Sequence, residues 1–519
     1  MKTTTILQNF LSKGILLTLF ITSTFNFYSQ GKIETKQKSY VFQEINSPRN
    51  FEKSFVENDF TYSIWTEGRG AKEVIKIAKF NTELNLIKES TLYYNRIGEK
   101  FIRAEKIGNT RFLIFSAINE NTRQISLYTR KIDLETLKTN LETINLSTQN
   151  KRQNNKDTEL KTIFTSNGIV VYNLLRKNNT SNSYQLKVTC FDSELTSKWQ
   201  KNIPLSSSED LKIREGVYTQ KEEVVLLIES KSKNIERSLI LVSNERESKL
   251  VHKIVEEKES PYKDMKLTIL DNGDIALVGI YDGNEFNGNR KGTFFNTYNP
   301  SDLSSIIKTN TQIPIALLLH DESEIIKKKT YKKGEKKQEL GIDKYFVIAD
   351  LLKGIDGGAI LIAEHQRIDG NTVKYAYNNK TKGDEFAFMD ILVIAMDKNG
   401  DVLWEKKIPK SQKNSGSEWL VSYNVVQSSN GLYFVFNDNI DNHMSDNERT
   451  QNMTRNKNEF ALSVYFINES GYMSRDVLAS YNTYTGFLVP SFSNQINENS
   501  LIGIMKSKNG SEKIVSFQF

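Results

Sequence analysis

The chain is 519 residues long, and its 70 basic and 63 acidic residues give a formal net charge of +7. Charges of both signs are mixed along it, which indicates an ordinary solvated surface and gives no reason to expect a nucleic-acid partner. The single cysteine, Cys190, excludes an intramolecular disulfide, so the fold must depend on apolar burial. Cys190 lies in an apolar run and is expected to be a buried structural thiol.

The first thirty residues are typical of a secretory signal. Lys2 and Lys13 precede a short apolar run at 14–21, and polar residues follow it. The run is shorter than the roughly 20 apolar residues that span a bilayer. We therefore expect 1–30 to be a signal peptide. The mature chain is then exported (periplasmic, outer-membrane associated or secreted) without a membrane span.

Six segments of the remaining chain share a turn that begins with Asp or Asn between two strand-like runs. They lie at 80–84, 132–136, 191–204, 298–302, 396–409 and 467–471. The two longest copies match at Asp192 and Asp397 and at Trp199 and Trp404, with Gly400 in the second turn. Self-similarity at a long period predicts an array of β-units.

Eight strand–turn–strand units follow one another, the early ones at a spacing of about fifty residues, which is typical of a propeller blade. We predict an all-β chain, a β-propeller of about eight four-stranded blades, with seven as the alternative count and a row of β-sandwiches as the alternative fold. The single propeller domain covers 31–519. Its blades are expected near 51–95, 100–147, 160–205, 210–256, 264–312, 345–410, 418–481 and 485–519, the last closed by a strand at 38–44.

Four insertions lengthen the later units. Three separate a second strand from a third, and the fourth, at 314–342, connects blade five to blade six with a helical start and a Lys-rich continuation. Such loops emerge on one face of a propeller, where binding usually resides. The candidate binding residues on this face are Phe286, Arg290, Lys327, Lys328, Lys332, Arg367, Tyr375, Tyr377, Phe386 and Phe388. Alternatively, the aromatic residues alternate in the two strands of a longer hairpin, and the Lys-rich run is only a solvated connector.

Catalytic groups are scarce. The four histidines show no metal-ligand spacing, and no nucleophile motif occurs. The Asp- and Asn-rich stretch at 437–448 could hold calcium through Asp438, Asp441 and Asp446, although it lacks the order of an EF-hand. Paired carboxylates for glycan cleavage cannot be identified from sequence, and Glu364, Asp384 and Glu385 are only acids that border the proposed face.

Ala395, Asp397, Gly400 and Trp404 resemble the outer-strand signature of quinoprotein-like (PQQ-type) propeller repeats. The resemblance implies that the tryptophans clamp neighbouring blades. The adjacent cysteine pair and metal site of quinone-binding members are absent, so we expect no quinone cofactor. The last third of the chain also resembles uncharacterised exported proteins of Bacteroidetes-type bacteria, which implies a cell-envelope location.

These observations favour a non-catalytic binding or scaffold propeller, monomeric, that binds an envelope protein or polysaccharide through its insertion loops. The alternative is a glycan-active hydrolase or lyase that uses scattered carboxylates, which would need a deep central funnel with two facing acids.

Overall fold

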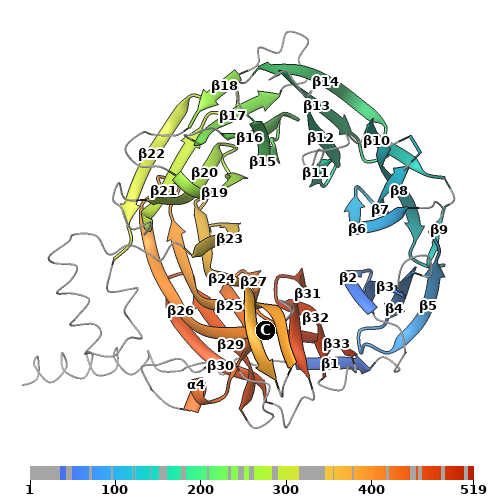
Figure 1. Cartoon of the computed structure of the whole chain (residues 1–519), viewed down its shortest axis with the longest axis vertical. Helices are drawn as coiled ribbons and strands as arrows, with labels where there is room; N and C mark the ends of the chain where they lie inside the picture. Colours follow the sequence, from blue (N-terminus) through green and yellow to red (C-terminus); the bar gives the residue numbers. More distant parts are fainter. Residues whose placement is uncertain are drawn as a thin grey trace, which may run out of the picture.

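A computed structural model shows eight antiparallel sheets arranged as the blades of a closed ring (Figure 1). Seven sheets have four strands, and the second has a short fifth strand at its outer edge. The structure describes residues 36–41, 49–68, 73–94, 98–119, 121–122, 124–140, 142–150, 160–176, 183–206, 210–231, 235–242, 251–255, 262–282, 290–314, 345–354, 356–376, 379–415, 420–444, 452–453, 459–480, 486–507 and 512–519.

Within the first seven blades the strands follow chain order from the hole outward. Blades one to four contain β2 (Arg49–Glu57), β3 (Phe60–Glu67), β4 (Val74–Phe80), β5 (Leu86–Leu92); β6 (Glu99–Ile107), β7 (Thr110–Asn119), β8 (Gln124–Asp133), β9 (Lys138–Thr139), β10 (Ile144–Asn150); β11 (Lys161–Thr165), β12 (Gly168–Arg176), β13 (Ser183–Phe191), β14 (Ser197–Ser206); and β15 (Asp210–Tyr218), β16 (Val224–Lys231), β17 (Ile235–Val242), β18 (Val251–Ile254).

Blades five to eight continue around the ring in the same way. They contain β19 (Tyr262–Ile269), β20 (Ile275–Asp282), β21 (Arg290–Tyr298), β22 (Ser305–Gln312); β23 (Phe346–Lys353), β24 (Ala359–Ala376), β25 (Asn379–Met396), β26 (Val402–Ser415); β27 (Asn424–Ser428), β28 (Gly431–Asn439), β29 (Phe460–Asn468), β30 (Met473–Ser480); and β31 (Phe487–Asn497), β32 (Ser500–Lys506), β33 (Glu512–Gln518). The prediction of an all-β propeller with eight blades is confirmed.

The ring is closed by a strand from the other end of the chain. The last three strands make an incomplete blade, and β1 (Lys36–Val41) supplies its outer edge, antiparallel to β33. The register runs from the pair Lys36↔Gln518 to the pair Val41↔Lys513. The strand expected at 38–44 therefore does close the eighth blade, and its bounds lie slightly earlier.

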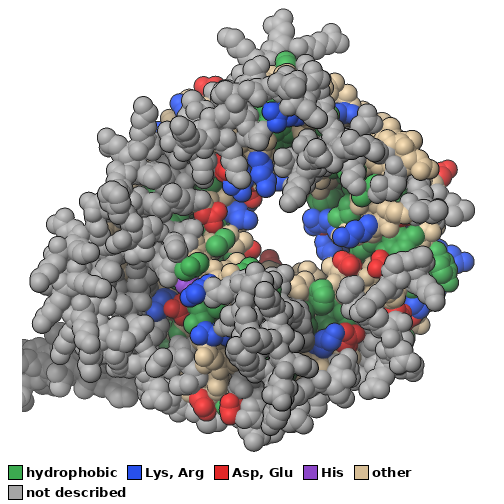
Figure 2. Space-filling model, in the orientation of Figure 1, with side chains coloured by type: hydrophobic (Ala, Val, Ile, Leu, Met, Phe, Trp, Pro, Cys, Tyr) green, Lys and Arg blue, Asp and Glu red, His purple; other side chains and the backbone are tan. Residues whose placement is uncertain are grey.

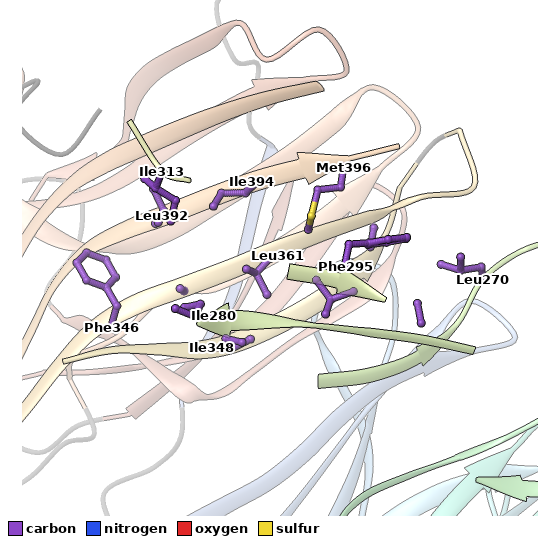
Figure 3. Packing of buried hydrophobic residues seen from close by; sticks show 14 residues of the cluster. Leu270, Ile280, Phe295, Ile313, Phe346, Ile348, Leu361, Leu392, Ile394 and Met396 are labelled. Atoms are coloured by element: carbon purple, nitrogen blue, oxygen red, sulfur yellow. The ribbon is translucent and has the colours of Figure 1, made fainter. Parts of the chain in front are cut away.

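The hydrophobic core lies between the faces of neighbouring blades. Figure 3 shows the cluster between blades five and six, where Ile280 and Phe295 approach Leu361 and Ile394. All four side chains are 0–1% exposed. The second strand of each blade is covered on both faces by other blades. This explains why its sequence is a continuous apolar run rather than an alternation of apolar and polar residues. Burial of this kind replaces the disulfides that the chain lacks.

The repeated Asp/Asn turns all connect the third strand of a blade to the fourth. In each, the side-chain oxygen of the first residue accepts a backbone N–H two residues later, as Asp192 does from Glu194 and Asp397 from Asn399. The same bond occurs at Asn81, Asp133, Asn299 and Asn468. The sequence repeat is therefore a turn with one defined conformation.

The helical insertion predicted at 314–342 lies, apart from its first residue, outside the described residues. Within the described ranges the helical content is one short segment, α4 (Asp441–Met444), between β28 and β29. No helix in those ranges is both long and apolar enough to cross a membrane.

Candidate functional site: the extended blade six

Blade six is longer than its neighbours. Its strands β24 and β25 each have 18 residues and form one hairpin, and β26 has 14. The alternative interpretation of the aromatic segments, a longer hairpin, therefore describes the backbone. The register of the hairpin continues from Ala359↔Met396 at its base to Ala376↔Asn379 near its tip, with shifts after Glu364 and Asp369.

The outer half of this hairpin is only partly paired. The inner strand β23 accompanies β24 as far as the pair Phe346↔His365, and β26 accompanies β25 as far as Glu385↔Ser415. Beyond these points, no other strand in the described part of the chain pairs with β24 or β25. Backbone donors and acceptors along such an edge are available to another chain.

A buried ion pair lies where the extension leaves the ring. The Nζ atom of Lys410 is 2.7 Å from Glu364 Oε1, and both side chains are 0% exposed. Lys410 also donates to the carbonyl of Phe388 and to Gln412 Oε1, at 3.1 and 2.9 Å. The other Glu364 oxygen accepts from Gln366 Nε2 and from Ser422 Oγ. The hydrogen bonds compensate for the cost of burying both charges.

The same burial shifts ionisation at this junction. Desolvation lowers the pKa of Lys410, and the nearby carboxylate of Glu364 opposes the shift. Desolvation, together with Asp350 and Glu364, raises the pKa of the Tyr423 phenol well above its ordinary value. Tyr423 donates to Asp350 Oδ2 at 2.8 Å and so ties blade seven to the inner strand of blade six.

Blade seven supports the extension from the outside. The N–H of Met453, in the long connection between β28 and β29, donates to the carbonyl of Ser411 on β26. Ser411 Oγ in turn donates to Asn452, whose carbonyl accepts from Asn439 Nδ2. The predicted insertion at 437–458 therefore contacts the extended part of β26.

A Ser, a His and an Asp meet in blade seven, but not in the geometry of a catalytic triad. Ser463 Oγ donates to Asp438 Oδ2 at 2.9 Å and lies 2.6 Å from His443 Nε2, the same nitrogen that is 3.5 Å from Asp438. In a triad the carboxylate and the nucleophile contact opposite imidazole nitrogens. Ser463 is also fully buried, so the three side chains hold the start of the connection in place.

The predicted binding residues have different positions. Arg367 is exposed on β24, with its guanidinium 5.7 Å from the Tyr345 ring centre. Phe386 is half-buried, and Phe388 is 7% exposed beneath Lys410. Arg290 and Tyr375 are placed by their backbone only, in β21 and β24. Phe286, Lys327, Lys328, Lys332 and Tyr377 lie outside the described residues.

The structure describes two of the three proposed calcium ligands, Asp438 and Asp441. Asp438 is 1% exposed, and its oxygens accept hydrogen bonds from Asn439, Asn442 and Ser463. Asp441 is exposed at the start of α4, and Asp446 lies outside the described residues. No group of three or more His, Cys, Asp or Glu side chains that could hold a metal occurs in the described part of the chain.

The inner strands are joined to one another by side chains. Glu215 Oε2 accepts the N–H of Leu267 from blade five, and Asp264 Oδ2 accepts that of Ile348 from blade six, both at 2.7 Å. Gln427 donates to the carbonyl of Lys353. Glu215 and Asp264 on this wall therefore each have a backbone partner on the next blade.

The tryptophan expected to clamp blades does so on β26. Trp404 Nε1 donates to the carbonyl of Glu469 at 2.8 Å, in the turn between β29 and β30 of blade seven. Trp199 is half-buried against the apolar cluster between blades three and four.

Comparison with known proteins identifies no family for the chain. No known family model and no curated protein matches the chain. Among solved structures, it is similar to the polysaccharide lyase Uly1 (10% identity, 94% of each chain, TM-score 0.37). It is also similar to the β-propeller domain of the Trilobed protease from Pyrococcus furiosus (10%, 84% of this chain and 99% of that one, TM-score 0.36). A third match is an α-L-arabinanase from Penicillium chrysogenum (11%, 68% and 98%, TM-score 0.33). At these values no activity is transferred.

Sequence reasoning missed Glu364 as a structural acid and missed Lys410 and Gln412 altogether. Glu364 and Lys410 lie on different strands and far apart in the chain, and nothing local distinguishes the three residues from other polar residues of a strand. The one available signal was a lysine, Lys410, directly after Ile408 and Pro409 in a strand that should face a neighbouring blade.

Proposed function

We propose that this protein is a non-catalytic binding or scaffold propeller of the bacterial cell envelope, and that it holds a partner protein through the extended hairpin of blade six. The observation that carries the proposal is the length of β24 and β25 beyond the strands that flank them. The ring supplies a rigid base, and the hairpin supplies a surface that the ring itself does not need.

The free edges favour a protein over a glycan at this surface. An extended segment of another chain can add to a strand edge through backbone hydrogen bonds, while side-chain positions on alternate residues give specificity. The exposed Ile368 and Arg367 lie at the start of the free portion of β24 and offer such contacts.

Non-catalytic function is supported by the state of the acids. Glycoside hydrolysis needs two carboxylates on either side of the scissile bond. Glu364 is buried against Lys410, and Glu215, Asp264 and Asp350 each accept a hydrogen bond from a neighbouring blade or from Tyr423. Because these carboxylates already have an ion-pair or hydrogen-bond partner, we prefer a binding function to hydrolase or lyase activity.

Shortening the hairpin tests the proposal. Asp369 and Glu385 are cross-strand partners, so joining them through Asn-Gly removes 370–384 and leaves the pairing of β25 with β26 intact. We expect an unchanged urea midpoint, because the buried junction remains, and loss of the partner that the intact chain captures from the native envelope.

A site-specific cross-link identifies the surface directly. A photoreactive residue at Ile368, which is 56% exposed, should cross-link to the captured partner. The matched control is Ile87 on β5, which is 52% exposed and far from the hairpin, and should not. Equal cross-linking at the two positions, or capture by the shortened chain, would contradict the assignment.

A further inference from the structure

The hole at the centre of the ring remains open when all side chains are drawn, and Lys and Arg side chains gather on its wall (Figure 2). The wall is formed by the first strand of each blade. Neighbouring blades cover both faces of such a strand, and its own second strand covers the outer edge. An exposed side chain on a first strand can therefore reach only the hole or its two mouths.

The exposed charges on these strands are mainly positive. Among first-strand side chains whose exposure the structure describes, the exposed charged residues are Glu52, Lys100, Arg103, Lys106, Lys212, Arg214 and Lys353. Six of these seven are cations. Five of the six lie on β6 and β15, in blades two and four, so the basic part of the wall is on one side of the ring.

The acids that pair with two of these arginines are much less exposed than the arginines themselves. Arg214 is 46% exposed and its partner Glu229 is 2% exposed, with two hydrogen bonds at 2.7 and 2.8 Å. Arg103 is 47% exposed and its partner Glu105 is 14% exposed. Each pair therefore presents its guanidinium to the hole. A hollow with low-dielectric walls strengthens the positive electrostatic potential that these cations produce.

The opposite side of the wall has no charge. The first strands of blades seven and eight, β27 and β31, contain no Lys, Arg, Asp or Glu, but carry Asn424, Gln427, Asn494 and Gln495. The Gln495 side chain exchanges two hydrogen bonds with the backbone of Gln427 across the two blades. Gln427 Nε2 donates to the carbonyl of Lys353, and Asn424 Nδ2 donates to that of Pro490, so the side-chain oxygens of these two residues are the groups that can accept from a ligand. Carboxamides both donate and accept hydrogen bonds, as do the hydroxyl groups of sugars.

We propose that the central hole binds a linear acidic polysaccharide, whose carboxylates face Lys100, Arg103, Lys212 and Arg214 and whose hydroxyls face the amide-rich wall. This site is separate from the blade-six hairpin. Charged groups of one sign with uncharged polar groups opposite suit a ligand that carries both anions and hydroxyls.

The variant that tests the site is Lys100→Gln with Lys212→Gln. In the part of the chain that the structure describes, neither lysine side chain makes a hydrogen bond or an ion pair, so the fold should be retained. The two arginines stay, because each is paired with an acid, Glu105 or Glu229. The matched control is Lys138→Gln with Lys398→Gln, two exposed lysines on the outer rim that change the net charge equally.

Binding is measured by calorimetry with an oligogalacturonate, using a neutral cello-oligosaccharide and a poly-glutamate peptide of equal length as comparisons. We expect oligogalacturonate to bind, to be weakened by added salt, and to lose about tenfold in affinity in the channel variant. The rim control and the hairpin-shortened chain should bind normally.

Equal loss in the channel and rim variants would overturn the site, as would the absence of oligogalacturonate binding. Equal binding of poly-glutamate would overturn the ligand class. The hairpin-shortened chain separates this proposal from the proposed function, since it removes partner capture and leaves the hole unchanged.

Discussion

The residue that follows each Asp/Asn turn shows how a strained backbone can be favoured by packing. Leu84, Leu137, Leu195 and Leu303 have φ between 56° and 63°, a region that costs a residue with a side chain about 1–2 kcal/mol. All four are 0–4% exposed, because the turn places the leucine between two blades. Burial offsets the strain.

Glycine takes this position where the neighbouring blade already fills the space. A Cβ at Gly471 would lie 2.7 Å from the Trp404 ring, and one at Gly400 would lie 2.2 Å from Thr309. The choice between Leu and Gly at one turn position therefore depends on the blade next to it.

At Leu137, the alanine and glycine variants should not show their usual order of stability, in which glycine is the less stable. Leu137→Ala loses about 2–5 kcal/mol of unfolding free energy because it empties a buried site and keeps the strain. Leu137→Gly also empties the site but relieves about 1 kcal/mol of strain, so it should be no less stable than the alanine variant. Urea unfolding measures both.

Leu113 is the control, because it is 0% exposed in the same apolar cluster but lies in a regular strand. At Leu113, the glycine variant should have an unfolding free energy about 0.5–1 kcal/mol lower than that of the alanine variant. The same order at both positions would argue against strain at Leu137.

At the level of elements, the junction of blades six and seven combines an extended hairpin with a buried polar network. Glu364, Lys410 and Gln412 come from β24 and β26, and they contact Ser422 and Asn437 of blade seven. Directional hydrogen bonds of this kind fix how two strands and a neighbouring blade are oriented, which apolar contacts alone do less strictly.

Removal of one member of the ion pair should cost more than removal of both charges. Lys410→Met leaves the Glu364 carboxylate buried without its cation, which is expected to cost about 3–5 kcal/mol of unfolding free energy. Adding Glu364→Gln should recover part of that loss, because the amide is neutral and still bonds to Gln366 or Ser422. If the double variant lost the sum of the two single effects, the charges would not be coupled.

At the level of the whole molecule, stability depends on a closed ring. Each blade buries its faces only against its neighbours, so the first and last blades must meet. The antiparallel pairing of β1 with β33 joins the two ends of the chain, and β2 packs beside β31. Closure also covers the outer edge of the eighth blade.

A chain that begins at residue 49 lacks β1 and should expose the edge of β33. We expect it to self-associate, because an uncovered strand edge pairs with another chain, and to unfold at lower urea than a chain that begins at residue 31. Light scattering after size-exclusion chromatography measures the association. A monomer of unchanged stability would show that β1 is dispensable.

The sequence by itself determined the fold class and the repeat. Turn residues act within a few positions of the chain, so Asp192 and Asp397 marked their turns, and the eight strand–turn–strand units gave the blade number. The closing strand could be predicted because an incomplete last blade needs a fourth strand. The hairpin of blade six was also visible as an alternation of aromatic residues.

Only the tertiary structure decided which polar residues meet. The pair Glu364–Lys410, the bonds from Glu215 and Asp264 to the next blade, and the basic side of the central hole all join residues that are distant in the chain or lie on different blades. Their contacts depend on the relative orientation of rigid blades. That orientation follows from the packing of the entire ring, which no local pattern of residues encodes.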